Sequence, residues 1–183
     1  MSEIGSRYSK VATGFGERVD GVPASAWDNA TPCEGWVARD IVRHLVEWMS
    51  AFPLATAGID VSGGPSVDDD PAGAWQALDG VLHSALADPA VASREIDTPM
   101  GRVTLERAVA TFCIPDILVH TWDLSRAAGL DERLDAEEVH QLLEGIEPMD
   151  EVLRESGQFG PRVHIAEDAD EQTRLIAFTG RHP

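Results

Sequence analysis

The sequence predicts an all-α protein, a helical bundle of one domain, and two observations support this. Apolar residues recur at intervals of three and four over most of the chain, which is the spacing of one helix face. Glycine, proline and aspartate separate these segments, and only one short region has β-like runs. A chain of 183 residues is long enough for a single full core.

Three helices are expected in the N-terminal half. The first covers residues 2–19 and is followed by the turn-forming sequence DGVP. The second covers residues 37–54 and the third residues 72–87, each with an apolar stripe at helical spacing. Residues 58–71 between them are rich in glycine and aspartate, which indicates an exposed loop with an acidic lead into the third helix.

The middle of the chain predicts a short hairpin and then a long helix. The hairpin, or an extended crossover, covers residues 94–105 around a Pro-Met-Gly turn. The fourth helix covers residues 105–128 and ends at Gly129, a residue type typical of the position after a helix. Because Pro115 lies inside this helix, we expect a local bend one turn earlier.

The C-terminal part predicts two further helical segments. A fifth helix is expected over residues 136–155 and a short sixth over residues 169–179, with an extended link between them. We therefore assign residues 1–157 to the bundle and residues 158–183 to a C-terminal extension that packs on it.

The charge balance excludes some partners. The net charge is −18, with 32 acidic and 14 basic residues. Such a surface repels nucleic acid and anionic membranes, so neither is expected as a partner. The first residues lack the pattern of a signal peptide, no apolar run reaches the length of a spanning helix, and two cysteines are too few for a disulfide framework. We expect a cytoplasmic protein.

Ligand-type residues interrupt the apolar stripes of two helices. Asp116 and His120 are four residues apart, so they stack one turn above each other on one helix face, and that face continues an apolar seam. His44 lies in the seam of the second helix, beside Ile41 and Leu45. Polar groups in an apolar seam need partners, because burial without them is costly.

A divalent cation would satisfy His44, Asp116 and His120 together, as in other metal sites between facing helices. The spacing leaves other interpretations open. A lone core histidine is usually just hydrogen-bonded, and Asp116 with His120 could be an orienting pair or a contact on a partly exposed face. Asp123 could orient the His120 imidazole or pair with Arg126, and Cys113 could border the metal or be an inert buried thiol.

Two segments resemble a known family. Residues 31–44 read TPCEGWVARDIVRH, and residues 116–124 read DILVHTWDL. Both are similar to motifs of the metal-binding domain group of the mycothiol-dependent maleylpyruvate isomerase, within the DinB-like superfamily. The ending over residues 159–183 is similar to that of an actinobacterial subgroup, so the resemblance covers nearly the whole chain.

This resemblance implies a DinB-like four-helix bundle, to which the sequence pattern adds one or two C-terminal helices and a short hairpin. It also implies a metal held by His44, Asp116 and His120. Asp116 stands where the isomerase has a glutamate, which is longer by one methylene group. The isomerase also has a C-terminal domain, whereas the residues after Gly129 look like two helices and a linker. We therefore expect that domain to be reduced or absent here, and its substrate and thiol contacts are not carried over.

The expected ligand set suits catalysis. Two histidines and one carboxylate leave one coordination position open, as in catalytic zinc sites, and the same set suits nickel, manganese or iron. The metal could activate a water molecule or bind a thiol as thiolate. Glu47, three residues after His44, is a candidate fourth ligand or catalytic base, or else a solvated helix glutamate.

We therefore expect a metal-dependent transferase or isomerase that acts on a small-molecule substrate, with zinc as the metal and mycothiol as the candidate thiol. The alternative is a non-catalytic bundle that binds a metal, a small molecule or a partner. We consider a homodimer as its assembly.

Overall fold

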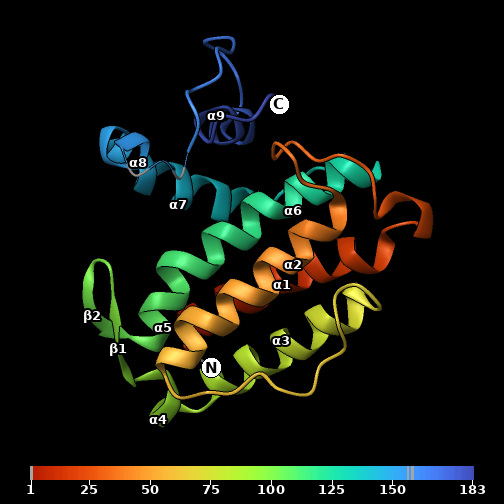
Figure 1. Cartoon of the computed structure of the whole chain (residues 1–183). Coiled ribbons are helices and arrows are strands. Elements are labelled where there is room, and N and C mark those ends of the chain that lie inside the picture. Colours follow the sequence, from red (N-terminus) through yellow and green to blue (C-terminus); the bar gives the residue numbers. More distant parts are fainter. Residues whose placement is uncertain (1, 156, 158) are drawn as a thin grey trace.

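Four long helices form the body of the computed structural model, which describes residues 2–155, 157 and 159–183. They are α1 (Glu3–Gly21), α2 (Ala38–Met49), α3 (Pro71–Ala87) and α6 (Ile114–Ala128). Both α1 and α2 pack against α3 and α6, so that the four helices enclose one core (Figure 1). The predicted all-α bundle is confirmed. Among the described residues, no helix is both long and apolar enough to cross a membrane.

Local signals set the helix ends, and apolar side chains hold the helices together. The Ser2 side chain accepts a 3.1 Å hydrogen bond from the Gly5 amide at the start of α1. At the end of α6, Gly129 has φ +69°, a conformation that favours glycine. The core between the four helices contains fully buried side chains from each of them, among them Tyr8, Phe15, Ile41, Leu45, Leu78, Leu82 and Ile117.

The predicted hairpin is present. Strands β1 (Glu95–Thr98) and β2 (Gly101–Thr104) pair antiparallel, and Ile96 lies opposite Val103. Ile96 is buried, whereas Met100 in the turn is exposed. The short helices α4 (Pro89–Ala92) and α5 (Leu105–Ala108) lead into and out of the hairpin.

Two π-helical turns interrupt helices in the described part of the chain, one at Pro53 and one just before Pro115. The first, Ser50–Leu54, contains Pro53 and follows α2. The second, Val109–Cys113, joins α5 to α6 just before Pro115. A proline cannot donate its backbone hydrogen bond, and a wider turn accommodates that loss. The expected irregularity before Pro115 is therefore a π turn, while the one at Pro53 was missed.

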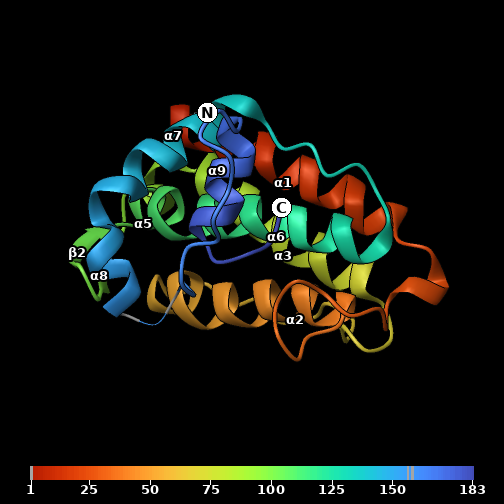
Figure 2. The ribbon, with the colours of Figure 1, turned by 90° about the horizontal axis from the view of Figure 1, so that it is seen from above.

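The C-terminal part differs from the expected single helix over residues 136–155. The chain forms α7 (Ala136–Ile146), a 3₁₀ turn (Glu147–Met149) and α8 (Asp150–Glu155), because Pro148 breaks the hydrogen-bonding pattern. Helix α9 (Glu171–Phe178) packs against α7, and both lie on the same side of the bundle (Figure 2). The predicted boundary between the bundle and the C-terminal extension falls between residues 157 and 158. Residue 158 lies outside the described residues, so the boundary stays a prediction.

Candidate metal site

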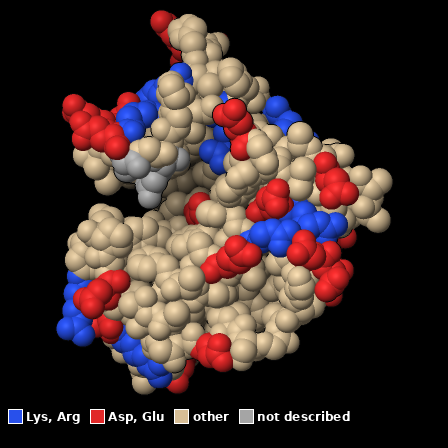
Figure 3. All heavy atoms as spheres, viewed as in Figure 1, with Lys and Arg blue, Asp and Glu red and all other residues tan. Residues whose placement is uncertain are grey.

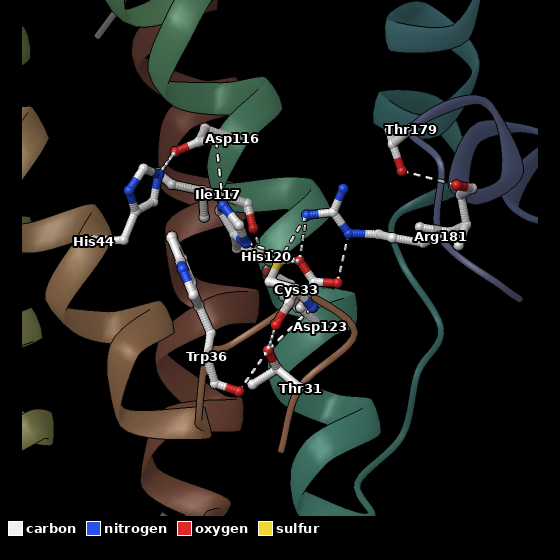
Figure 4. A network of polar contacts seen from close by, with 12 residues as sticks. Thr31, Cys33, Trp36, His44, Asp116, Ile117, His120, Asp123, Thr179 and Arg181 are labelled. Carbon is white, nitrogen blue, oxygen red and sulfur yellow. Dashed lines mark hydrogen bonds and ion pairs between the residues drawn. The ribbon is translucent and has the colours of Figure 1, made fainter. Parts of the chain in front are cut away.

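The ligand-type side chains of α2 and α6 meet between these two helices. His44 comes from α2, whereas Asp116 and His120 come from successive turns of α6 (Figure 4). His44 Nε2 lies 3.0 Å from Asp116 Oδ2, and His120 Nε2 lies 3.5 Å from Asp116 Oδ1. The carboxylate thus faces both imidazoles, and the structure brings the three residues together.

The three side chains have a spacing that a small cation can use. One ligand atom from each lies within 4.8 Å of the other two. Zinc binds nitrogen and oxygen at about 2.1 Å, so two ligands of a tetrahedral site are roughly 3.4 Å apart. The observed separations of 3.0 and 3.5 Å are close to this value. The donor set therefore fits a divalent metal ion, and its role as a metal site stays a prediction.

The site is reached from one side. The side chains of His44 and Asp116 are 32% and 30% exposed, whereas that of His120 is 8% exposed. Figure 3 shows that the surface is hollowed between the C-terminal helices and the bundle, with acidic atoms visible inside the hollow. A small molecule could therefore approach from the side of His44 and Asp116, with His120 behind them.

Aromatic side chains extend away from the site along α2. The Trp36 ring lies 5.1 Å from the His44 ring, and the Trp48 ring lies 6.2 Å from it. Phe52 stacks on Trp48 at 6.3 Å and contacts Phe112 edge-on at 5.7 Å. These aromatic residues are half-buried, so they offer an apolar surface beside the polar group.

A second carboxylate fixes the far side of His120. Asp123 is completely buried, and its Oδ2 lies 2.8 Å from His120 Nδ1. Since a carboxylate accepts, Nδ1 carries the hydrogen, and Nε2 is directed toward Asp116. Arg181 forms two hydrogen bonds to Asp123, of 2.6 and 2.7 Å (Figure 4). This carboxylate–imidazole pairing is typical of histidines that bind metals.

The charges of these groups depend on one another. Burial lowers the pKa of His120, but the charge of Asp116 and the hydrogen bonds to Asp123 and Cys33 raise it to about 10. Burial raises the pKa of Asp116, yet the two histidines and the Trp48 indole hold it below its usual value. In the metal-free protein both directions favour a charged Asp116 beside a protonated His120, so a metal would replace a proton of His120.

The loop before α2 brings two more residues to the site. Thr31 Oγ1 accepts a 3.1 Å hydrogen bond from the Cys33 amide, and the Thr31 amide donates to the Trp36 carbonyl at 3.0 Å. Gly35 has φ +79°, which lets the loop turn sharply. The tight turn places the Cys33 sulfur 3.4 Å from Asp123 Oδ2 and the Trp36 ring over the histidines.

Other expectations have mixed outcomes. The Glu47 side chain is exposed, and the groups of metal-binding side chains among the described residues do not include it. Its role stays a prediction. Cys113 is fully buried, and burial raises the pKa of its thiol well above its ordinary value, which agrees with an inert thiol. Arg126 pairs with Glu132 and not with Asp123, whereas Asp123 contacts His120, in agreement with the orienting role.

Sequence reasoning missed Cys33 and Arg181 as parts of this network, and it did not identify Trp48 as a partner of Asp116. The Trp48 indole donates a 2.8 Å hydrogen bond to Asp116 Oδ2. One signal was available: Cys33 lies inside the first family-like motif, and Arg181 lies in the family-like ending.

Comparison with known proteins agrees with these features. A family model described as the mycothiol maleylpyruvate isomerase N-terminal domain matches residues 9–125, which contain all three predicted metal ligands. Two relatives are uncharacterized proteins of Mycobacterium tuberculosis, Rv0738 of strain H37Rv and MT0763 of strain CDC 1551. Each is 27% identical over 137 residues, which cover 71% of this chain and 70% of the relative. No solved structure matches the chain significantly.

Proposed function

The chain belongs to the family of the mycothiol maleylpyruvate isomerase N-terminal domain, and from this premise we propose that it is a metal-dependent enzyme. In this proposal His44, Asp116 and His120 bind one divalent ion. The enzyme acts on a small molecule and uses a low-molecular-weight thiol, mycothiol or a close relative, in a transfer or an isomerisation.

The convergence of these three side chains supports the proposal most strongly. Their ligand atoms come from two helices and lie within 4.8 Å of one another. Neighbouring side chains on the same two helices, Ile41, Leu45 and Ile117, are buried and apolar, so three ionisable groups beside them require a function or a compensating partner. A divalent ion would compensate all three, and His44 and Asp116 are the two ligands that solvent and a small molecule can reach.

The protein groups around the proposed site have separate tasks. A divalent ion with an open position would lower the pKa of a bound water or thiol. His120 is held in one tautomer by Asp123, and Asp116 is held by the Trp48 indole. The half-buried rings of Trp36 and Trp48 flank His44, where they would exclude water from an apolar part of the substrate or thiol.

Zinc is the metal we propose first. Two imidazoles, one carboxylate and an open position form a ligand set found in catalytic zinc sites. Nickel, manganese and iron bind the same ligand types, so the metal is to be identified by elemental analysis of protein purified without added metal.

The test of the site compares two histidine variants. His44→Ala removes a proposed ligand, whereas His140→Ala changes an exposed histidine that pairs with Glu171. We expect about one equivalent of metal in the wild-type protein and in His140→Ala, and a loss of at least tenfold in metal affinity in His44→Ala. Equal metal content in all three proteins would refute the site.

The test of thiol use is a titration of the metal-loaded protein with mycothiol. With cobalt as the metal, binding of the thiol as thiolate should change the visible spectrum, and His44→Ala should abolish that response. A cobalt-loaded protein whose spectrum does not change with added mycothiol would favour the alternative, a non-catalytic metal-binding bundle.

We also propose Glu47 as a catalytic base, although its exposed side chain would have to act through water. Glu47→Gln should retain the metal and lower turnover in a substrate assay. Unchanged turnover would leave Glu47 as a solvated surface residue.

A further inference from the structure

Arg181 brings the end of the chain to the proposed metal site. It follows α9, and its side chain is only 14% exposed. Its Nε and Nη2 donate hydrogen bonds of 2.6 and 2.7 Å to the two oxygens of Asp123. Nη2 also lies 3.3 Å from Cys33 Sγ (Figure 4). This two-pronged pairing has a fixed geometry that lysine cannot reproduce.

Among the residues that the structure describes, two groups of metal-binding side chains share His120. One consists of His44, Asp116 and His120, and the other of Cys33, His120 and Asp123. A thiolate, an imidazole and a carboxylate form a zinc ligand set as good as the first one. Sequence and ligand chemistry alone therefore do not decide on which side of His120 a metal would bind.

The second group already contains a cation. The Arg181 guanidinium contacts both Asp123 oxygens and the Cys33 sulfur, the same atoms that a metal would need on this side. Two positive charges at one completely buried carboxylate repel each other strongly. On the His44 side, the described contacts of Asp116 are His44, Trp48 and His120, and they include no arginine or lysine. The positive charge there is a proton on His120, which a metal can displace, whereas the charge of an arginine cannot be removed.

We propose that Arg181 is a positioning residue: it occupies the Cys33–Asp123 side of His120 and thereby directs the metal to the His44–Asp116 side. This inference rests on the proposed metal-dependent function. The arginine also holds Asp123 as the acceptor for His120 Nδ1–H, which keeps Nε2 directed at Asp116. The C-terminal segment thus takes part in metal selection without binding the metal.

The experiment uses cobalt, because a cobalt–thiolate bond adds a charge-transfer absorption in the near ultraviolet that nitrogen and oxygen ligands do not give. The full-length wild-type protein is compared with Arg181→Met, Arg181→Lys, Cys33→Ser and the double variant Arg181→Met/Cys33→Ser. The matched control is Arg174→Met, which removes another arginine of the same segment, one that pairs with Glu147 at the surface.

We expect the wild-type protein, Arg174→Met and Cys33→Ser to bind cobalt without the sulfur band and with affinities within about twofold of each other. Arg181→Met should gain the sulfur band, and the double variant should lose it. The double variant can bind the metal only on the His44 side, and Arg181 no longer holds Asp123 in place as the acceptor for His120. Its affinity for cobalt should therefore fall about tenfold to a hundredfold. Arg181→Lys keeps the charge and should show less of the band than Arg181→Met.

The outcomes separate this inference from the proposed function. A wild-type protein that binds no cobalt refutes both. A sulfur band in the wild-type protein, or a large loss of affinity in Cys33→Ser, refutes only this inference, because the metal would then lie on the Cys33 side. Arg181→Met without a sulfur band, folded and loaded with cobalt, also refutes it. If Arg181→Met does not fold, Arg181→Lys takes its place, and a folded, cobalt-loaded Arg181→Lys protein without any sulfur band refutes the inference.

Discussion

The indole of Trp48 donates a 2.8 Å hydrogen bond to Asp116 Oδ2, the same oxygen that lies 3.0 Å from His44 Nε2. Trp48 is one helical turn after His44 on α2, so the two side chains reach the same carboxylate from adjacent positions. The carboxylate is thereby fixed in rotation, with Oδ1 directed to His120. A metal ligand held in this way needs little rearrangement on binding.

Trp48→Phe should therefore weaken metal binding while keeping the aromatic surface. We expect the dissociation constant to rise about tenfold, because the hydrogen bond that orients Asp116 is lost. The metal-free protein should lose about 1–2 kcal/mol of stability, since a hydrogen bond to a charged group is removed. Competition titration with a metal indicator and urea unfolding measure the two effects.

Trp27→Phe is the control for this change. Trp27 is also half-buried, and it packs under Arg39 rather than at Asp116. Its variant should bind metal as the wild-type protein does. Equal losses of affinity in both variants would mean that the Trp48 hydrogen bond has no specific effect on the site.

The bundle could be predicted from the sequence because helical periodicity and end signals are local properties. The stripes of α1, α2 and α3 and the glycine at the end of α6 gave the elements to within a few residues. The break of the fifth helix at Pro148 was missed, although the proline was visible. A helical stripe continued across it, but Pro148 cannot donate the backbone hydrogen bond that a continuous helix needs, and a 3₁₀ turn forms there instead.

The candidate site could be predicted only in part. The spacing of Asp116 and His120 is local, and the motifs linked them to His44. Cys33 and Arg181 are 148 positions apart in sequence and meet only because the 31–36 loop and the segment after α9 converge on α6. A long-range contact of this kind leaves no periodic pattern in a single sequence.

Removing the metal should lower the thermal stability of the protein. A ligand that binds only the folded state adds about 2.7 kcal/mol when its free concentration is a hundred times its dissociation constant. For a chain of this size that corresponds to about 5–10 °C in Tm. Differential scanning calorimetry with and without a chelator measures the shift, and His44→Ala should show none. A wild-type Tm that is the same with and without the chelator would contradict the metal site.

The C-terminal extension should unfold together with the bundle. Phe178 on α9 is buried and lies 4.8 Å below the Arg154 guanidinium. Phe178→Ala should cost about 3–5 kcal/mol, because it leaves a cavity, and unfolding should remain a single transition. Val152→Ala changes an exposed side chain of α8 and should cost less than about 0.5 kcal/mol. Two separate transitions in denaturant would show instead that residues 158–183 form an independent unit.

The metal-free protein should lose stability as the pH rises above neutrality, and His120 is the cause. Its pKa is about 10 in the folded protein, against an ordinary value of about 6.5 in the unfolded chain. A folded-state pKa that is raised contributes stability that is fully present below pH 6.5 and is lost as the pH rises through 10. Each unit of difference corresponds to about 1.4 kcal/mol, so the decline should reach a few kcal/mol.

Urea unfolding of the chelator-treated protein between pH 6 and 10 measures this decline. His120→Gln cannot take up the proton, so its unfolding free energy should be lower at pH 6 and nearly independent of pH over this range. His140→Gln, which changes an exposed histidine paired with Glu171, should keep the wild-type decline. A wild-type curve that is flat from pH 6 to 10 would mean that His120 is neutral in the metal-free site. In that case the contacts of His120 with Asp116 and Asp123 do not keep it protonated, and metal binding would displace no proton from it.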